Sequence, residues 1–230
     1  MEAAKALVPA ASVIVIRPTT SGGFETLLLK RNHTVPFAAN YWVFPGGKIE
    51  ESDYGVNDSE IDAALNAAIR ECKEEAGIDL VSSQLQYFST WTAPLQAKKR
   101  FITHFFVAEV ACDQAVNVDG WEIVQGDWSP LAEAVAKGAC GEYKMMPPTI
   151  VSLFDLRQNN SASAMQIFLS ERPYFDYAPK IVRNDEGFWA VYQGDSAWIS
   201  GDLNDQVSLH RLHESSKGVY SYYRGNECLR

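Results

Sequence analysis

The sequence contains few cysteines, and they lie far apart. The residues of this type are Cys72, Cys112, Cys140 and Cys228, and no two of them form a Cys-x-x-Cys pair. This spacing argues against the dense disulfide framework of small secreted domains and against a cysteine-based zinc site. We therefore expect reduced thiols.

The sequence also lacks an uninterrupted apolar run long enough to cross a bilayer. The apolar segment ALVPAASVIVIRP has no basic start and is interrupted by Pro9 and Pro18, which favours an early strand over a signal peptide. We expect a cytoplasmic protein that does not bind membranes.

Positive charge is scarce. The 230 residues include 20 Lys and Arg against 29 Asp and Glu, which gives a formal net charge of −9. Broad nucleic-acid binding depends on Lys and Arg, so this balance argues against a nucleic-acid partner. An anionic small-molecule ligand would need metal ions and a local basic patch to overcome the overall negative field.

Hydrophobic periodicity predicts a mixture of strands and helices. Residues 11–17 and 25–31 are β-rich runs separated by PTTSGG, which indicates an antiparallel hairpin. A helix should begin after Ser59, with Asp62 completing a capping box, and should end at Gly77. The other expected elements are strands at 85–92, 101–110 and 121–128, a helix over 129–137 ending at Gly138, a helix from about Pro148, a linker at 158–164, and strands in PKIVRN, GFWAVYQG, VSLHRLH and GVYSYYR.

Three glutamates crowd the last turns of the helix predicted between Ser59 and Gly77. Glu71, Glu74 and Glu75 fall within roughly a 100° arc, beside the apolar stripe of the helix. Neighbouring carboxylates repel one another and resist burial, and a hard divalent cation relieves both effects. The pattern predicts bound Mg²⁺ or Mn²⁺, with a solvated acidic helix face as the alternative. The apolar stripe that we expect consists of Ile61, Leu65, Ala68, Cys72 and Ala76.

The run RECKEEAGI at residues 70–78 resembles the core of the Nudix hydrolase box, and FPGGKIE upstream resembles the loop that opens it. Counting back from Arg70, the motif's acidic position falls on Asp62. There are 14 residues between Gly47 and Asp62 where the family pattern has five, so we expect a loop insertion of nine. Cys72 replaces the usual larger aliphatic residue.

The resemblance implies roles for particular residues. Glu71, Glu74 and Glu75 would bind the metal together with a backbone carbonyl of Gly46 or Gly47, and Arg70 would orient the glutamates. Glu122, six residues before Trp128, resembles a downstream family glutamate and would act as a further metal ligand or general base; the alternative is an ordinary surface residue. The residues expected to take part in catalysis are Glu74, Glu122 and Arg70.

Upstream of the box, LLLKRNHTVPFAANYWVFPGG resembles the coenzyme A diphosphatase element of the Nudix superfamily, in its peroxisomal-type branch. Leu27, Leu28, Arg31 and the segment 44–47 match this element, whereas Pro36 and Asn40 replace its interior Arg and Gly. The resemblance implies that Arg31, Gly47 and Arg100 bind substrate. An aromatic face for adenine would come from Trp91, Phe101 or Phe105, unless these residues belong to the core.

The expected fold is therefore an α/β Nudix-type α/β/α sandwich with a mixed sheet over residues 1–157, followed by a β-rich extension over 158–230. The extension would serve as a substrate lid or as an oligomer interface, the latter in a homodimer. The implied reaction is Mg²⁺-dependent hydrolysis of coenzyme A or an acyl derivative to 3′,5′-ADP and 4′-phosphopantetheine. An ADP-ribose or dinucleotide pyrophosphatase and a non-catalytic nucleotide sensor are the alternatives.

Overall fold

The computed structural model describes residues 6–20, 22–56 and 58–229. The first five residues of the predicted N-terminal domain, Asn57 of the predicted insertion and the last residue of the predicted extension lie outside the described residues. None of the helices within the described ranges combines the length and apolarity needed to span a membrane.

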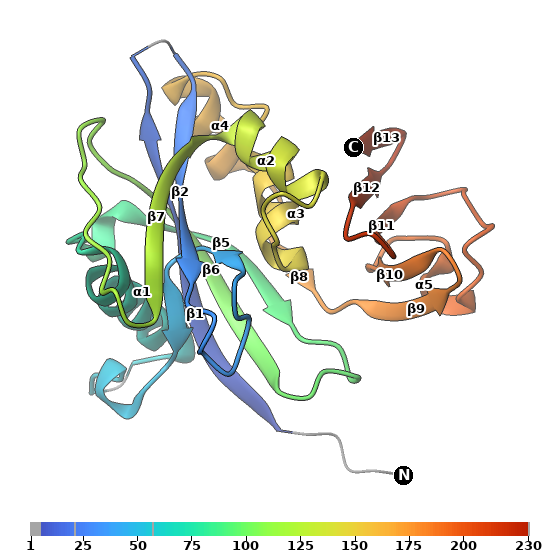
Figure 1. Cartoon of the computed structure of the whole chain (residues 1–230), viewed down its shortest axis with the longest axis horizontal. Helices are drawn as coiled ribbons and strands as arrows, with labels where there is room; N and C mark the ends of the chain where they lie inside the picture. Colours follow the sequence, from blue (N-terminus) through green and yellow to red (C-terminus); the bar gives the residue numbers. More distant parts are fainter. Residues whose placement is uncertain (1–5, 21, 57, 230) are drawn as a thin grey trace.

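A mixed β-sheet forms the centre of the molecule (Figure 1). Its strands are β1 (Leu7–Pro18), β2 (Phe24–Arg31), β3 (Trp42–Val43), β4 (Gly46–Lys48), β5 (Leu85–Thr92), β6 (Arg100–Glu109), β7 (Ile123–Pro130) and β8 (Phe175–Tyr177). The order is β3-β2-β1-β6-β5-β8, with β4 paired to β1 and β7 paired to β2. β1 and β6 run parallel, whereas β1 and β2 form the predicted antiparallel hairpin.

Both faces of this larger sheet are covered, which explains the nearly continuous apolar run of β1. Val13 and Val15 pack on one face with α1, whereas Ile14 and Ile16 pack on the other with α2 and α3. The helices are α1 (Glu60–Ala76), α2 (Leu131–Ala139), α3 (Pro147–Leu156) and α4 (Ala162–Glu171), with the short helical segments η1 (Glu51–Asp53), η2 (Ser82–Gln84) and α5 (Ala197–Ser200). The predicted α/β/α sandwich with a mixed sheet is confirmed.

The ends of α1 agree with the prediction, but its buried face differs. Ser59 and Asp62 form the capping box, and Gly77 ends the helix in a left-handed conformation with φ of 67°. Ile61, however, is 38% exposed. The expected stripe was wrong at its start because this alanine-rich helix packs small side chains against the sheet. The buried residues of α1 are Ala63, Ala64, Ala67, Ala68, Cys72, Glu75 and Ala76.

Gly138 does not end α2, contrary to the prediction. It lies inside the helix and is buried. A Cβ atom at this position would lie 2.6 Å from Ile150 Cδ1 and 2.8 Å from Met145 Sδ. The glycine therefore permits close packing between α2 and α3 instead of providing a helix cap. The predicted linker at 158–164 also contains the start of α4, where the Ser161 side chain accepts from the Ala164 N–H.

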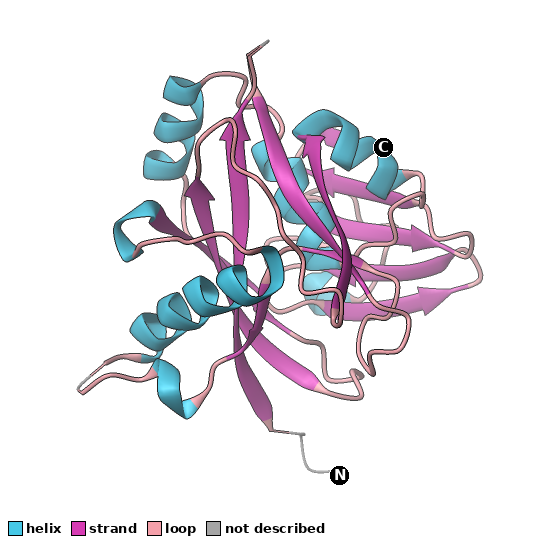
Figure 2. Cartoon of the chain, turned by 60° about the vertical axis from the view of Figure 1, so that its left-hand side comes forward, coloured by secondary structure: helices cyan, strands magenta, loops and turns pink. Residues whose placement is uncertain are grey.

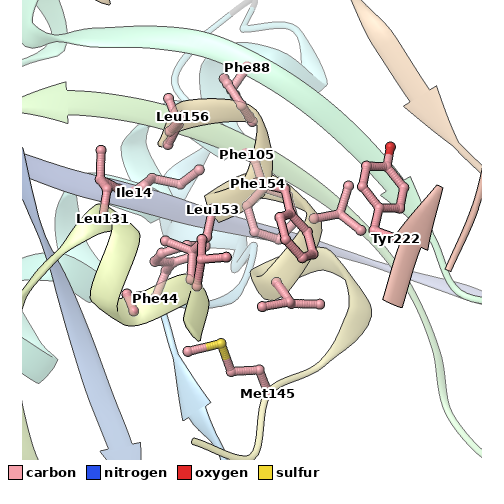
Figure 3. Packing of buried hydrophobic residues seen from close by; sticks show 14 of the residues in the cluster. Ile14, Phe44, Phe88, Phe105, Leu131, Met145, Leu153, Phe154, Leu156 and Tyr222 are labelled. Carbon is pink, nitrogen blue, oxygen red and sulfur yellow. The ribbon is translucent and has the colours of Figure 1, made fainter. Parts of the chain in front are cut away.

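The C-terminal part of the chain forms a second, antiparallel sheet in the order β13-β12-β11-β10-β9 (Figure 2). Its strands are β9 (Lys180–Asn184), β10 (Gly187–Val191), β11 (His210–Ser215), β12 (Tyr220–Arg224) and β13 (Glu227–Leu229). Helix α3 lies between the two sheets (Figure 1). Tyr222 stacks on Phe154 with ring centroids 5.5 Å apart, within a cluster that reaches Phe44 and Phe105 (Figure 3). One hydrophobic core therefore joins the β-rich extension to the larger sheet.

Candidate metal and catalytic site

Glu75 is the most buried of the three crowded glutamates, with 4% of its surface exposed. The backbone N–H of Gly46 donates to its Oε2 at 2.9 Å. Burial raises the pKa of Glu75 to about 8, and the charges of Glu71 and Glu122 add to this effect. Burial also raises the pKa of Glu71. The Glu74 side chain is 59% exposed, so the need for a nearby positive charge is greatest at the inner two glutamates.

The two glycines of the box loop allow α1 to approach β4. A Cβ atom on Gly47 would lie 2.1 Å from Glu71 Oε1, and one on Gly46 would lie 2.4 Å from the carbonyl oxygen of Ala11. Side chains at these positions would displace Glu71 or β1. Gly46 contacts Glu75 through its N–H, and its predicted role as a carbonyl metal ligand stays a prediction.

Arg70 joins the box loop to the glutamates. Its Nε and Nη2 donate to the two carboxylate oxygens of Asp53 at 2.9 Å each. Nη1 donates to Glu71 Oε1 at 2.9 Å and to Glu74 Oε2 at 3.2 Å. Nη2 also reaches the carbonyl of Lys48 at 3.1 Å. Arg70 therefore orients two glutamates while its own guanidinium is held by a two-point ion pair.

Asp53 was missed by the sequence analysis, which assigned the motif's acidic position to Asp62. Asp62 is the N3 residue of the α1 capping box and bonds Ser59. Asp53 is a buried residue of η1. Although desolvation opposes its charge, the hydrogen bonds from Arg70 keep the pKa of Asp53 low. Counting forward from Gly47, instead of back from Arg70, places Asp53 after the five intervening residues that the motif requires. The nine extra residues therefore lie between Asp53 and Arg70, not between Gly47 and the motif acid.

The structure brings Arg31 and Glu122 to the glutamates, although they are far apart in the sequence. β2 pairs with β7 so that Arg31 lies opposite Ile123, after a register shift at Lys30/Arg31. The Arg31 Nη2 forms a close ion pair with Glu122, and its Nη1 lies 3.8 Å from Glu75 Oε1. The Glu122 N–H donates to Asp119 Oδ1 at 2.7 Å, which fixes the loop before β7.

The other predicted substrate residues are distributed differently. Arg100 Nε donates to the Ala93 carbonyl at 3.2 Å, beside the turn between β5 and β6. Trp91 is 4% exposed and stacks on Tyr177, and Phe105 is 6% exposed and packs against Phe44. These two rings belong to the core. Of the three aromatic candidates, Phe101 alone is half-buried, and it contacts Phe37.

The donor set fits a hard divalent cation in its chemistry. Carboxylate oxygens are the ligands that Mg²⁺ and Mn²⁺ prefer, and burial makes their negative charge costly. In the part of the chain that the structure describes, no three acidic, histidine or cysteine side chains form a ready-made metal group. Arg70 and Arg31 instead pair with these carboxylates. Part of the charge compensation that we attributed to a cation alone therefore comes from two arginines.

Comparisons with known proteins identify the family and the fold of this chain. A model of the NUDIX domain matches residues 6–148. A Caenorhabditis elegans protein described as putative nudix hydrolase 7 is 26% identical over 184 residues, which are 65% of this chain and 60% of that protein. The chain thus spans less than two thirds of the length of this relative. The crystal structure of a NUDIX hydrolase from Alicyclobacillus acidocaldarius superposes with a TM-score of 0.64 at 21% identity, covering 73% of this chain and 97% of that one, and this likeness shows the shared fold.

Proposed function

From the premise that this chain belongs to the NUDIX family, we propose that it hydrolyses the diphosphate bond of a nucleoside diphosphate linked to a second group. The observation that supports this proposal most directly is the buried carboxylate of Glu75, held by the Gly46 N–H and neighboured by Glu71, Arg31 and Glu122. Bound Mg²⁺ or Mn²⁺ would polarise the diphosphate and acidify a water molecule for attack on phosphorus.

Residues of this chain would hold such an ion and position the reactants. Glu71, Glu74 and Glu75 supply the carboxylates, with a backbone carbonyl of Gly46 or Gly47 as a further ligand. The ion pair between Arg70 and Asp53 keeps Glu71 and Glu74 aimed at the same point. Glu122 is 44% exposed on its side chain, which suits a residue that accepts a proton from water. Arg31 lies between Glu75 and Glu122 and would bind the diphosphate oxygens.

The substrate that we propose is coenzyme A or an acyl derivative, cleaved to 3′,5′-ADP and a 4′-phosphopantetheine product. This rests on the matching residues Leu27, Leu28, Arg31 and 44–47 before the box. Pro36 and Asn40 depart from that element, and these departures favour ADP-ribose or a dinucleotide as the second substrate class. A non-catalytic nucleotide sensor is the third reading, which the intact set of Glu71, Glu74 and Glu75 disfavours.

We also propose that residues 1–157 are the catalytic unit and that 158–230 act as a lid or as an interface in a homodimer. Arg100 belongs to this proposal as a substrate-binding residue.

A panel of diphosphates, incubated with and without Mg²⁺ or Mn²⁺ and resolved by chromatography, tests the function. We expect metal-dependent cleavage of coenzyme A derivatives by the wild type. Glu75→Gln keeps an acceptor for the Gly46 N–H but removes the buried charge, and should lower kcat by about 10²–10³-fold. Glu133→Gln, an exposed residue of α2, is the matched control. Turnover of ADP-ribose alone would support the second substrate class, and no turnover of any compound would favour the sensor.

A further inference from the structure

Two lysines and two aromatic rings meet beside the box loop, outside the cluster of glutamates. β4 pairs with β1 so that Lys48 lies opposite Ala10, and β6 runs along the other edge of β1 with Phe101 opposite Val8. Residues two apart in a strand share a face, so Lys48 and Phe101 point to the same side of the larger sheet. Gly47, one residue earlier, faces α1 and Glu71. The two groups of side chains therefore lie on opposite sides of one short strand.

Lys99 brings a second ammonium group to the same place. Its Nζ lies 5.0 Å from the centre of the Phe101 ring. Desolvation and the neighbouring charge of Lys48 lower the pKa of Lys99. Among the ion pairs of the described residues, none involves Lys48 or Lys99. Two like charges close together in a protein with a net charge of −9 repel one another, and a bound anion would remove this repulsion.

The rings next to these lysines are accessible. Phe37 and Phe101 have centroids 5.4 Å apart in a tilted arrangement, and Phe37 is 44% exposed. The carbonyl of Phe37 accepts from Arg31 Nε at 3.1 Å, and Arg31 reaches Glu75 and Glu122. Phe37 is therefore linked through one residue to the proposed cleavage site. An aromatic pair of one exposed and one half-buried ring beside ammonium groups suits a nucleobase with a phosphate attached to its sugar.

We propose that Lys48 and Lys99 bind a phosphomonoester on the nucleoside part of the substrate, while Phe37 and Phe101 stack against its base. This inference rests on the proposed function, because the nucleotide would extend from the cleavage site around the end of β4. It gives a physical reason for choosing between the substrate classes, since coenzyme A carries such a phosphate on its ribose and ADP-ribose does not.

Calorimetric titration of the 230-residue protein with adenosine 3′,5′-bisphosphate and with adenosine 5′-monophosphate tests this subsite. The wild type should prefer the bisphosphate by about tenfold or more, as expected for losing one hydrogen-bonded charge contact. Lys99→Gln and Lys48→Gln should remove this preference without weakening the monophosphate. Lys98→Gln makes the same charge change one residue away and should keep the preference for the bisphosphate. Phe37→Leu should weaken both ligands together.

A wild type that binds the two nucleotides equally, or an equal loss in Lys98→Gln and Lys99→Gln, would overturn the subsite. Because these titrations need no turnover, they separate the subsite from the activity. A lysine-dependent preference in a protein that cleaves no diphosphate keeps the subsite and removes the proposed function. Cleavage of coenzyme A and of its dephosphorylated form with equal kcat/KM, unaffected by Lys99→Gln, would remove the subsite and keep the proposed function.

Discussion

Two networks of buried and half-buried charge in this protein have opposite balances. Near the C-terminal half of α1, two arginines face an excess of acids. The residues of this network are Arg31, Arg70, Asp53, Glu71, Glu74, Glu75 and Glu122. Between α3 and the β-rich extension, the single carboxylate of Asp155 pairs with Arg172 at 3.2 Å and with Arg224 at 2.7 Å.

The difference indicates which network stabilises the fold and which one suits a ligand. Each oxygen of the Asp155 carboxylate pairs with an arginine, so its charge is compensated within the protein although burial raises its pKa too. Arg172 also donates to the Phe88 carbonyl at 2.8 Å. On the α1 side the acids exceed their partners, and burial raises the pKa of Glu71 and Glu75. Buried acids in excess take up protons unless a further positive charge is bound beside them, so this network suits a cationic ligand.

The largest effect that we expect comes from breaking the satisfied network. Asp155→Asn leaves Arg172 and Arg224 without a counter-charge and should lower the free energy of unfolding by about 3–5 kcal/mol. Urea denaturation measures this, with Asp185→Asn in an exposed turn as the control. Activity per folded molecule should stay unchanged. A selective loss of activity would show that this network serves the site after all.

Gly47→Ala should lower activity more than stability, the reverse of what we expect for Asp155→Asn. The added methyl group displaces the Glu71 carboxylate, so kcat/KM should fall by about 10²-fold, as expected for a reacting group misplaced by about 1 Å. Steady-state kinetics and thermal unfolding together measure the split. Gly138→Ala is the matched control, because its methyl group meets Ile150 and Met145 in the core and should cost about 1–3 kcal/mol of stability without changing kinetics. Similar profiles for the two variants would contradict the comparison.

Asp53→Asn sharpens the role of the acid that the sequence analysis missed. Arg70 would lose the charge that fixes it, so Glu71 and Glu74 should be held less firmly. We expect the Kd for Mn²⁺, measured by electron paramagnetic resonance, to rise by about tenfold, the effect of weakening one charged hydrogen bond. Asp58→Asn alters the same loop, but Asp58 accepts from the Gly55 N–H and does not hold Arg70. Equal effects in both variants would assign the change to the loop and not to the ion pair.

The smallest effect concerns pH and lies in the extension. Burial lowers the pKa of His210 to about 4 from 6.5. Below pH 6.5 the unfolded chain protonates this histidine, whereas the folded protein does not until about pH 4, so the contribution of His210 to stability should decrease as the pH falls through this window. The raised pKa of Glu75 contributes with the opposite sign. His210→Gln should reduce this slope in urea titrations at pH 7 and pH 5. A slope that is the same in the wild type and in His210→Gln would be evidence against the assignment to His210.

Much of the site was predictable because its parts are local. The capping box of Ser59 and Asp62, the Gly77 stop and the arc of three glutamates all depend on residues within one helix. Two of the errors have local causes as well. Gly138 resembles a helix stop in sequence but permits close packing of α2 and α3. Asp62 has the motif's spacing when it is counted back from Arg70, but not when it is counted forward from Gly47.

The sequence by itself determined α1, its caps, its glutamates and the hairpin before it, since hydrogen bonds between near neighbours and the helical period specify these features. Tertiary structure alone decided that Arg31 meets Glu122 across the β2–β7 pair and that Lys48 meets Lys99 across β1. It also decided that Asp155 joins the extension to the core. These contacts depend on strand register and sheet order, which bring together groups that no local pattern relates.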